Sequence, residues 1–266
     1  MGKSEKKRKM PDQETRIVAI MNQKGGVGKS TTAVNLAAAL GEKKYKVLVV
    51  DFDPQGNATS GFGIDKNEIE LTIYDAILND ADPLQVVHGT GSAYVNILPA
   101  TIQLAGAEIE LVSVVAREMR LKEVVDKVKD AYDFVLIDCP PSLGILTMNA
   151  LAASKELLIP IQCEYYALEG VTKLLESTKM VKTRLNPNLD ILGILMTMYD
   201  SRTSLSKQVV NEVGDYFGEQ MFKTVIPRNV RLSEAPSFGM SIFEYDDHSK
   251  GAKAYRELAK EVVSRG

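Results

Sequence analysis

The chain has 266 residues, of which 45% are hydrophobic and 25% are charged, and its formal net charge is −3. This balance is typical of a globular protein and argues against a broadly basic nucleic-acid-binding protein, so any DNA contact must use a local patch. Two cysteines and two histidines exclude a disulfide framework and a thiolate metal cage, and no apolar run is long enough for a membrane span or a secretion signal, which predicts a cytoplasmic protein.

Residues 1–15, MGKSEKKRKMPDQET, are polar and basic and show no hydrophobic periodicity. A segment of this composition cannot bury enough apolar surface to fold, so we predict a disordered basic tail. A weak, salt-sensitive role of this tail in holding DNA or anionic lipid stays open.

From residue 16 onward, strand-like and helix-like segments alternate. Continuous apolar runs are typical of strands buried on both faces, and segments with apolar residues at helical spacing lie between them. The predicted strands are 16–22, 46–53, 134–140, 156–162 and 189–198, and the predicted helices include 30–45, 104–131 (two helices) and 168–185. Such alternation implies right-handed crossovers. We therefore predict a doubly wound α/β fold with a mostly parallel sheet, in a single domain over residues 16–266.

The segment NQKGGVGKSTT, residues 22–32, lies between the first predicted strand and the first predicted helix. Its glycines free the backbone N–H groups to surround phosphate oxygens, and the following helix presents its N-terminus to the same anion. Lys29 can contact the β- and γ-phosphates, and the hydroxyl of Ser30 can ligate Mg²⁺. The loop departs from the general phosphate-binding pattern because Gln23 replaces its first glycine and an additional lysine, Lys24, lies inside it.

Two acidic residues end predicted strands. Asp53 follows Asp51 at a spacing of two in the run VVDFD, and Asp138 ends the run VLID. Because ligands of doubly wound sheets bind beyond the carboxyl ends of the strands, both belong near the phosphate loop. Asp53 can orient or activate the water that attacks the γ-phosphate, and Asp138 can hold Mg²⁺ directly or through water. Together with the loop they predict a Mg·ATP site.

Several segments are similar to those of one family. KGGVGKSTT, DFDPQGNATSG, LIDCPPSLG, IQCEYYALEG and IPRNVRLSEAPSFG resemble the ParA/Soj chromosome- and plasmid-partitioning ATPases. The resemblance covers nearly everything from Arg16 onward and places the chain in the deviant Walker A group of P-loop NTPases, which includes MinD and the nitrogenase iron protein. It implies a three-layer α/β/α fold and an ATP hydrolase with slow intrinsic turnover.

The resemblance also assigns roles to individual residues. It implies nucleotide contacts from the loop and from two residues near the adenine: Gly25, Gly26, Val27, Gly28, Lys29, Ser30, Thr31, Pro227 and Asn229. It implies Mg²⁺ ligands at Ser30, Asp53 and Asp138. It implies catalytic roles for Lys24, Lys29 and Asp53.

For the additional lysine, the resemblance implies a role between subunits. In this group the residue at the position of Lys24 crosses a nucleotide-sandwich dimer and contacts the phosphates of the other subunit. Since ATP carries charge that ADP lacks, this contact favours the ATP-bound homodimer. The dimer is expected to bind double-stranded DNA without sequence preference through Arg202 and Arg231. A ParB/Spo0J-type centromere-binding partner is expected to stimulate hydrolysis and release the dimer, which implies a nucleoid-associated protein.

Three alternatives stay open. A MinD-like membrane ATPase would need a C-terminal amphipathic helix; segment 251–266 has helical periodicity, but its apolar face is modest, so we expect packing on the domain and no stable membrane insertion. An ATP-dependent ligase or a reductase component would share the scaffold, although the paired cysteines of an iron–sulfur version are missing. A nucleotide-gated regulator of replication or transcription would hydrolyse ATP only incidentally.

Overall fold

The computed structural model describes residues 14–165 and 167–265. Residues 1–13 of the predicted basic tail lie outside the described residues, so the division of the chain after residue 15 stays a prediction. Thr15 is buried, and its hydroxyl lies 3.1 Å from the carbonyl oxygen of Lys129 and 2.9 Å from that of Tyr132. The residue just before the first strand is therefore packed against the chain segment that leads into a neighbouring strand.

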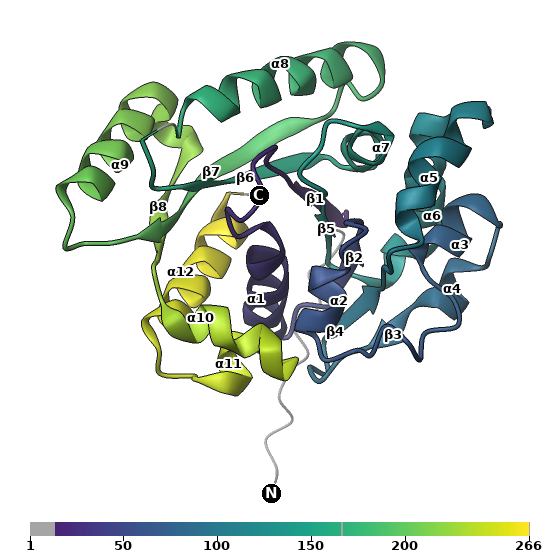
Figure 1. Ribbon diagram of the computed structural model, residues 1–266, viewed down its shortest axis with the longest axis horizontal. Coiled ribbons are helices and arrows are strands. Elements are labelled where there is room, and N and C mark those ends of the chain that lie inside the picture. The colour runs from purple at the N-terminus through teal and green to yellow at the C-terminus, as the bar shows by residue number, and fades with distance from the viewer. Residues whose placement is uncertain (1–13, 166, 266) are drawn as a thin grey trace, which may run out of the picture.

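One eight-stranded sheet runs through the molecule in the order β3-β4-β2-β5-β1-β6-β7-β8 (Figure 1). In chain order the strands are β1 (Arg16–Ile20), β2 (Val47–Asp51), β3 (His88–Gly89), β4 (Val95–Leu98), β5 (Phe134–Asp138), β6 (Glu156–Gln162), β7 (Asp190–Tyr199) and β8 (Met221–Pro227). Neighbouring strands are parallel except for β3 and β4, which are antiparallel at one edge. The prediction of a mostly parallel sheet is confirmed.

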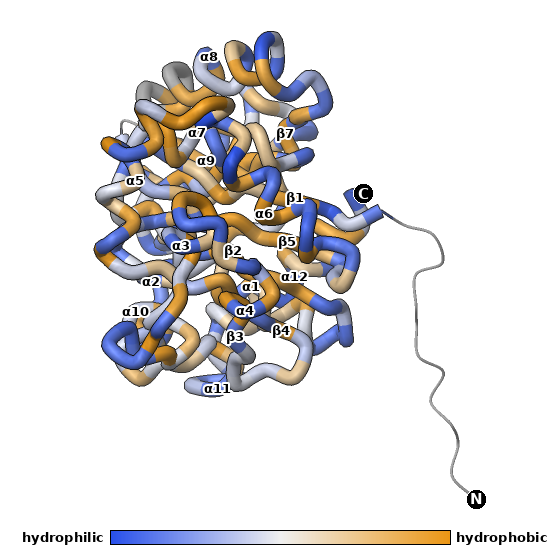
Figure 2. Tube along the Cα trace, turned by 90° about the vertical axis from the view of Figure 1, so that its right-hand side faces the viewer, coloured by the Kyte–Doolittle hydropathy of each residue, from blue (hydrophilic) through white to orange (hydrophobic). Residues whose placement is uncertain are grey.

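Helices cover both faces of the sheet. The α-helices are α1 (Lys29–Glu42), α2 (Asn57–Gly61), α3 (Ile73–Leu78), α4 (Pro83–Val86), α5 (Leu104–Glu110), α6 (Arg120–Val128), α7 (Ile145–Ala153), α8 (Glu169–Arg184), α9 (Ser204–Phe217), α10 (Val230–Glu234), α11 (Ile242–Tyr245) and α12 (Lys250–Ser264). One buried cluster joins the sheet to α3–α9, and a second joins it to α1, α2 and α10–α12. Hydrophobic strands run between these two layers in Figure 2. The doubly wound, three-layer α/β/α prediction is therefore confirmed.

The central strands bring the predicted motifs to one edge of the sheet. All residues of β2 and β5 are buried, as expected for strands covered on both faces. In the strand register, Asp138 is paired with Ile20 on one side and with Asp51 on the other. Pro160, which has no backbone N–H to donate, lies in β6 beyond the last residue that pairs with β1. Because β1 lies between β5 and β6, the phosphate loop that follows β1 leaves the sheet near its centre.

The C-terminal helix α12 packs on the domain, as its periodicity predicted. Its apolar face is buried and consists of Ala252, Tyr255, Leu258, Ala259 and Val262. It lies beside α1 (Figure 1), where the hydroxyls of Tyr255 and Thr32 are 3.2 Å apart. No helix among the described residues is long and apolar enough to cross a membrane. The face that a membrane-binding helix would need to expose is thus part of the core.

Some elements differ from the prediction, and others were not predicted. Segment 104–131 contains two α-helices as predicted, but 3₁₀ turns at 111–113 and 117–119 separate them, and Ala116 between these turns has a φ of 54°. A third 3₁₀ turn follows α6 at 129–131, and two more follow α9 and α10 at 218–220 and 235–238. Strands β3, β4 and β8 were not predicted. They are short or lie at the edges of the sheet, where partly exposed strands need no continuous apolar run.

Candidate nucleotide-binding site

The glycine-rich loop joins β1 to α1 in a conformation that requires glycine at two positions. Gly26 has a φ of 76° and Gly28 a φ of 89°, in the left-handed region that other residues rarely adopt. Gly28 is also the residue that precedes α1, so the first N–H groups of this helix point towards the space that the loop encloses. The backbone is thus shaped to surround an anion.

Hydrogen bonds from two other strands hold this loop in place. The side chain of Asn22 donates to the carbonyl oxygen of Pro160 (2.7 Å) and accepts from the backbone N–H of Lys24 (2.9 Å). The hydroxyl of Thr197, on β7, donates to the carbonyl oxygen of Val27 (2.9 Å). Both Val27 and Thr197 are buried. Thr197 gave no signal in the sequence, because it lies within an apolar run that is typical of a core strand.

Lys29 is a buried cation at the base of the loop. Its side chain is in the first turn of α1, the residue is only 6% exposed, and its ammonium donates to the carbonyl oxygen of Lys24 (3.2 Å). Burial lowers the pKa of Lys29, while the nearby carboxylates of Asp138 and Asp53 act in the opposite direction. An additional anion beside this ammonium would compensate for the water that it has lost.

Asp138 is a buried carboxylate without a hydrogen-bond partner. It is 0% exposed, and neither of its side-chain oxygens forms a hydrogen bond with any residue that the structure describes. Burial and the neighbouring Asp51 raise the pKa of Asp138 well above its usual value, whereas Ser30 and Lys29 lower it. Ser30 is thus close to this carboxylate, although no bond of good geometry joins them. Such a group is costly to leave uncompensated.

These residues fit a magnesium ion that also binds phosphate and water. Within the described residues, no three histidine, cysteine or acidic side chains form a metal-binding cluster. Mg²⁺ typically takes only one or two carboxylates and completes its shell with water and substrate phosphates. The unpartnered oxygens of Asp138, the hydroxyl of Ser30 and the carboxylate of Asp53 suit this kind of site.

The two aspartates at the end of β2 differ in their surroundings. Asp51 is fully buried and accepts hydrogen bonds from the backbone N–H and the hydroxyl of Thr59 (both 2.7 Å) and from the N–H of Asp53 (3.3 Å). Burial raises the pKa of Asp51 to about 6, although these hydrogen bonds oppose the rise. Asp51 therefore fastens α2 to the sheet. The carboxylate of Asp53 accepts from the N–H of Gln55 (3.0 Å), and Asp53 lines the cavity described next.

Two adjoining cavities lie at this edge of the sheet. The first has a volume of about 620 Å³ and is lined by the loop, the start of α1 and Asp53, and the second, of about 360 Å³, includes Pro227 and Asn229. Both share Gly28, Thr31, Met198 and Pro236. The side-chain oxygen of Asn229 caps α10 by accepting from the N–H of Arg231 (2.9 Å), which leaves its amide N–H groups for a ligand. The space is therefore continuous from the phosphate loop to the residues predicted near the adenine.

Comparison with known proteins identifies the family of this chain. A family model described as an AAA domain matches residues 15–191. The chain is 56% identical over 251 residues to the sporulation initiation inhibitor protein Soj of Bacillus subtilis, a match that covers 94% of this chain and 99% of that protein. It is 53% identical over 250 residues to the chromosome partitioning protein ParA of Myxococcus xanthus, covering 94% and 88%. The chain belongs to the ParA/Soj family of chromosome-partitioning ATPases.

A solved structure supports the ligand as well as the fold. The cobyrinic acid a,c-diamide synthase of Mycobacterium smegmatis, crystallised with an ATP analogue and magnesium, superposes with a TM-score of 0.83 at 39% identity and 94% coverage of both chains. The predictions of an ATP hydrolase with ATP and Mg²⁺ as cofactors are confirmed. Identity to the partitioning ATPases is higher than to this synthase, which favours the ParA/Soj prediction over a ligase.

For a ParA/Soj protein, the position of the additional lysine is informative. The ammonium of Lys24 forms an ion pair with the carboxylate of Glu164, in the turn after β6, and these side chains are 53% and 45% exposed. Lys24 lies outside the lining of both cavities, unlike Lys29. Gly25, next to it, has a φ outside the left-handed region, and a Cβ added there would meet nothing within 4 Å. The contacts within the chain therefore do not explain the glycine at position 25.

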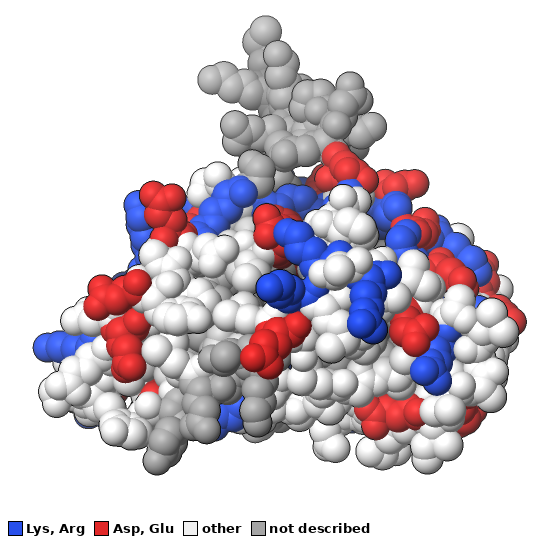
Figure 3. All heavy atoms as spheres, turned by 90° about the horizontal axis from the view of Figure 1, so that it is seen from above, with Lys and Arg blue, Asp and Glu red and all other residues white. Residues whose placement is uncertain are grey.

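The two predicted DNA-binding arginines lie after neighbouring strands. Arg202, between β7 and α9, has an 84% exposed side chain that forms two hydrogen bonds with Asp200 (2.9 and 2.7 Å). Arg231, in α10, is 54% exposed and pairs with Glu234 (3.0 Å) and Asp246 (3.5 Å). On the face that carries α8, the basic and acidic side chains of the described residues are interspersed (Figure 3).

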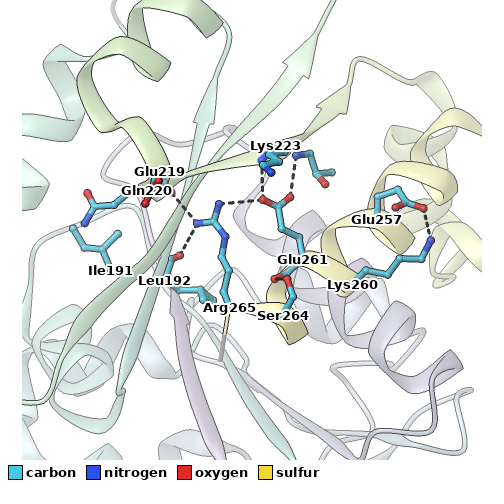
Figure 4. Close-up of a pocket in the computed structure, with 11 residues that line it drawn as sticks. Ile191, Leu192, Glu219, Gln220, Lys223, Glu257, Lys260, Glu261, Ser264 and Arg265 are labelled. Atoms are coloured by element: carbon cyan, nitrogen blue, oxygen red, sulfur yellow. Dashed lines mark hydrogen bonds and ion pairs between the residues drawn. The ribbon is translucent and has the colours of Figure 1, made fainter.

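A third hollow, of about 810 Å³, lies at the opposite end of β7 and β8 (Figure 4). Arg265 crosses it and donates to the carbonyl oxygens of Leu192 (3.0 Å), Gln220 (3.1 Å) and Met221 (2.7 Å), and also to Glu261 (3.0 Å). Because these charged groups bind one another and the strand ends, the hollow marks a structural contact between α12 and the sheet.

Proposed function

We propose that this ATPase acts in chromosome or plasmid partitioning as an ATP-gated homodimer that binds DNA without sequence preference. On this proposal it works in the cytoplasm on the nucleoid, and a ParB/Spo0J-type partner stimulates hydrolysis and releases it. Membership of the ParA/Soj family supports a role in partitioning. The geometry of the site supports dimerisation that depends on ATP.

The main observation in favour of ATP-dependent dimerisation is the contrast between the two lysines of the loop. Lys29 is buried and lines the cavity of its own subunit, whereas Lys24 is half exposed, lies outside that lining and is paired with Glu164. A cation so placed would be accessible to the phosphates of a nucleotide that approaches from a second subunit. The bare surface at Gly25 would allow that approach. Because ATP offers more negative charge than ADP, a second subunit is held more tightly with ATP.

Within each subunit, the proposed chemistry depends on positioning and electrostatics. The loop N–H groups and Lys29 would bind the phosphates, and Ser30, Asp53 and Asp138 would hold the magnesium ion, which neutralises phosphate charge when bound. Asp53, which lines the cavity, would orient the attacking water. In a dimer, Lys24 of one subunit would add positive charge beside the phosphates of the other.

DNA binding would use Arg202 and Arg231, two exposed arginines that follow β7 and β8. Each already lies beside carboxylates, so its contact with a DNA phosphate must compete with an acidic neighbour. A monomer would offer few phosphate contacts and bind weakly. Dimerisation would double their number, and affinity for DNA rises steeply with the number of cationic contacts.

The test is binding to random-sequence duplex DNA with ATP, with ADP and without nucleotide. We expect binding with ATP alone, loss of that binding in Lys24→Ala, and loss in the double variant Arg202→Ala/Arg231→Ala with its affinity for nucleotide retained. In the single arginine variants, the slope of log affinity against log salt should fall by about 1 per phosphate contact removed.

Arg184→Ala is the matched control, because Arg184 is an exposed arginine at the end of α8, beside the start of β7 rather than its carboxyl end. It should bind DNA as the wild type does. Absence of DNA binding in every nucleotide state, or equal binding in all of them, would overturn the proposal and direct attention to membranes and small-molecule substrates.

A further inference from the structure

The ion pair between Lys24 and Glu164 joins two parts of the chain that are far apart in sequence. Lys24 lies on the phosphate loop and Glu164 in the turn after β6, which leads to α8. Both side chains are about half exposed, so neither needs this partner to compensate for burial. The pair instead sets where the ammonium of Lys24 lies within its own subunit.

Backbone contacts fix both ends of this pair. On the loop, the N–H of Lys24 donates to Asn22, and the side chain of Asn22 is bonded to β6 through Pro160. On the other side, the N–H of Glu164 donates to the carbonyl oxygen of Gln162 (2.8 Å), and the carbonyl of Glu164 accepts from Ala167 (3.0 Å). The ends of β1 and β6 therefore hold the two charged residues beside each other.

We propose that Glu164 is a positioning residue that holds Lys24 within its own subunit and so sets the threshold for ATP-dependent dimerisation. This inference rests on the proposed function, in which Lys24 contacts the phosphates of the other subunit. To make that contact, Lys24 must exchange the carboxylate of Glu164 for the polyphosphate. Each subunit loses its ion pair between Lys24 and Glu164 in this exchange, so two ion pairs are broken for each dimer formed.

The size of the effect follows from the exposure of the pair. An exposed ion pair contributes a factor of about 1.4 to 5 to an equilibrium, and two pairs together about 2 to 25. Such a cost is small beside the attraction of an ammonium for a triphosphate, so it does not prevent dimerisation. It shifts the equilibrium towards separate subunits by the same factor, which matters most when the phosphates attract Lys24 less strongly.

The test compares Glu164→Gln with the wild type by sedimentation velocity, using a non-hydrolysable ATP analogue and Mg²⁺. The variant keeps the size of the side chain and removes its charge. We expect the dimer dissociation constant to fall by about 2- to 25-fold. Glu164→Asp, which keeps the charge, should restore most of the wild-type value. Glu257→Gln, which removes an exposed carboxylate paired with Lys260 on α12, is the matched control and should leave the constant unchanged.

A second readout separates the pair from a general effect of charge near the phosphates. Removing any nearby negative charge would strengthen nucleotide binding to the monomer, whereas release of Lys24 acts only between subunits. Nucleotide affinity measured at concentrations too low for dimers should therefore change less than twofold in Glu164→Gln.

An unchanged or weaker dimer in Glu164→Gln, or a parallel gain in monomer nucleotide affinity, would overturn the inference alone. If the wild type itself forms no dimer with the ATP analogue, the proposed function fails, and the inference fails with it. The wild-type measurement thus distinguishes the two cases.

Discussion

At the scale of single residues, the site is distinguished by how its buried charges are satisfied. Asp51 and Asp138 are neighbours in the strand register, and both are fully buried. Asp51 accepts hydrogen bonds from Thr59 and Asp53, so its carboxylate supports the fold. The oxygens of Asp138 have no such partner in the described part of the chain. One carboxylate is therefore structural, and the other is available to a cation.

Replacing these two carboxylates by amides should have opposite effects on the nucleotide-free protein. Asp138→Asn removes a buried carboxylate that no hydrogen bond satisfies, so we expect its free energy of unfolding to rise by about 1 kcal/mol. Asp51→Asn weakens satisfied hydrogen bonds and should lower it by about 1–3 kcal/mol. Urea denaturation without nucleotide measures both changes.

Magnesium dependence gives the second half of this prediction. In the wild type, Mg²⁺ should strengthen ATP binding relative to ATP with a chelator, and in Asp138→Asn most of that gain should be lost. A less stable Asp138→Asn protein that still responds fully to Mg²⁺ would show that this carboxylate is structural.

At the scale of secondary-structure elements, α12 is attached to the sheet at its C-terminal end by a cluster of charges. Glu261 accepts from the N–H groups of Lys223 (2.8 Å) and Thr224 (3.0 Å) at the start of β8 (Figure 4). Arg265 donates both to Glu261 and to carbonyl oxygens at the starts of β7 and β8. The guanidinium of Arg265 also lies 4.1 Å from the centre of the Phe222 ring. These contacts hold the helix whose Tyr255 lines the second cavity.

Glu261→Gln should destabilise the protein in a pH-dependent way. Burial alone would raise the pKa of Glu261, but the N–H groups of Lys223 and Thr224 and the guanidinium of Arg265 lower it below its ordinary value of 4.5. A lowered pKa means that the ionised form stabilises the fold above about pH 4.5 and that this contribution is lost as the pH falls through the folded-state pKa.

At pH 7 we expect the free energy of unfolding of Glu261→Gln to fall by about 1.5–3 kcal/mol, and the difference from the wild type to shrink in acid below about pH 4.5. Urea denaturation at several pH values measures it. Glu257→Gln, in the exposed pair with Lys260, should change stability by less than about 0.5 kcal/mol. Equal effects of the two variants at pH 7 would contradict this account.

At the scale of the whole molecule, the carboxyl edge of the sheet carries both the nucleotide cavities and the surface by which two copies would meet. Gly25 and Gly26 are adjacent there, yet their backbone conformations differ. A Cβ added at either position would meet nothing within 4 Å, but Gly26 has a positive φ and Gly25 does not. Gly25 lines the first cavity, so a side chain at this position would meet a ligand or a second subunit rather than this chain.

Valine at these two positions should separate folding from assembly. We expect Gly25→Val to unfold within about 1 kcal/mol of the wild type and to bind ATP, but to lose ATP-dependent dimerisation, because its side chain occupies the approach of the second subunit. Gly26→Val should already impair ATP binding, since a β-branched residue is strained at a positive φ. Calorimetry with ATP and sedimentation measure the two properties. A Gly25→Val protein that dimerises normally would contradict the prediction.

Much of the fold and of the phosphate site could be predicted because the relevant signals are local. The continuous apolar runs of β1, β2, β5, β6 and β7 and the spacing of Gly-Lys-Ser placed the loop, Lys29 and Asp138 at one edge of a parallel sheet. Each signal lies within a segment of about ten residues, in which hydrophobic periodicity and backbone conformation are determined by near neighbours. The partly exposed strands β4 and β8 lack such a signal.

The sequence by itself determined the α/β architecture, the phosphate loop, the candidate metal ligands and the family. Only the tertiary structure decided which buried carboxylate is satisfied, that Thr197 holds the loop, and that Lys24 rests against Glu164. Thr197 is 170 residues from its partner Val27, and Glu164 is 140 residues from Lys24. Hydrogen bonds and ion pairs depend on distances of a few ångströms in space, and such distances between remote residues exist only once the sheet has brought its strands together.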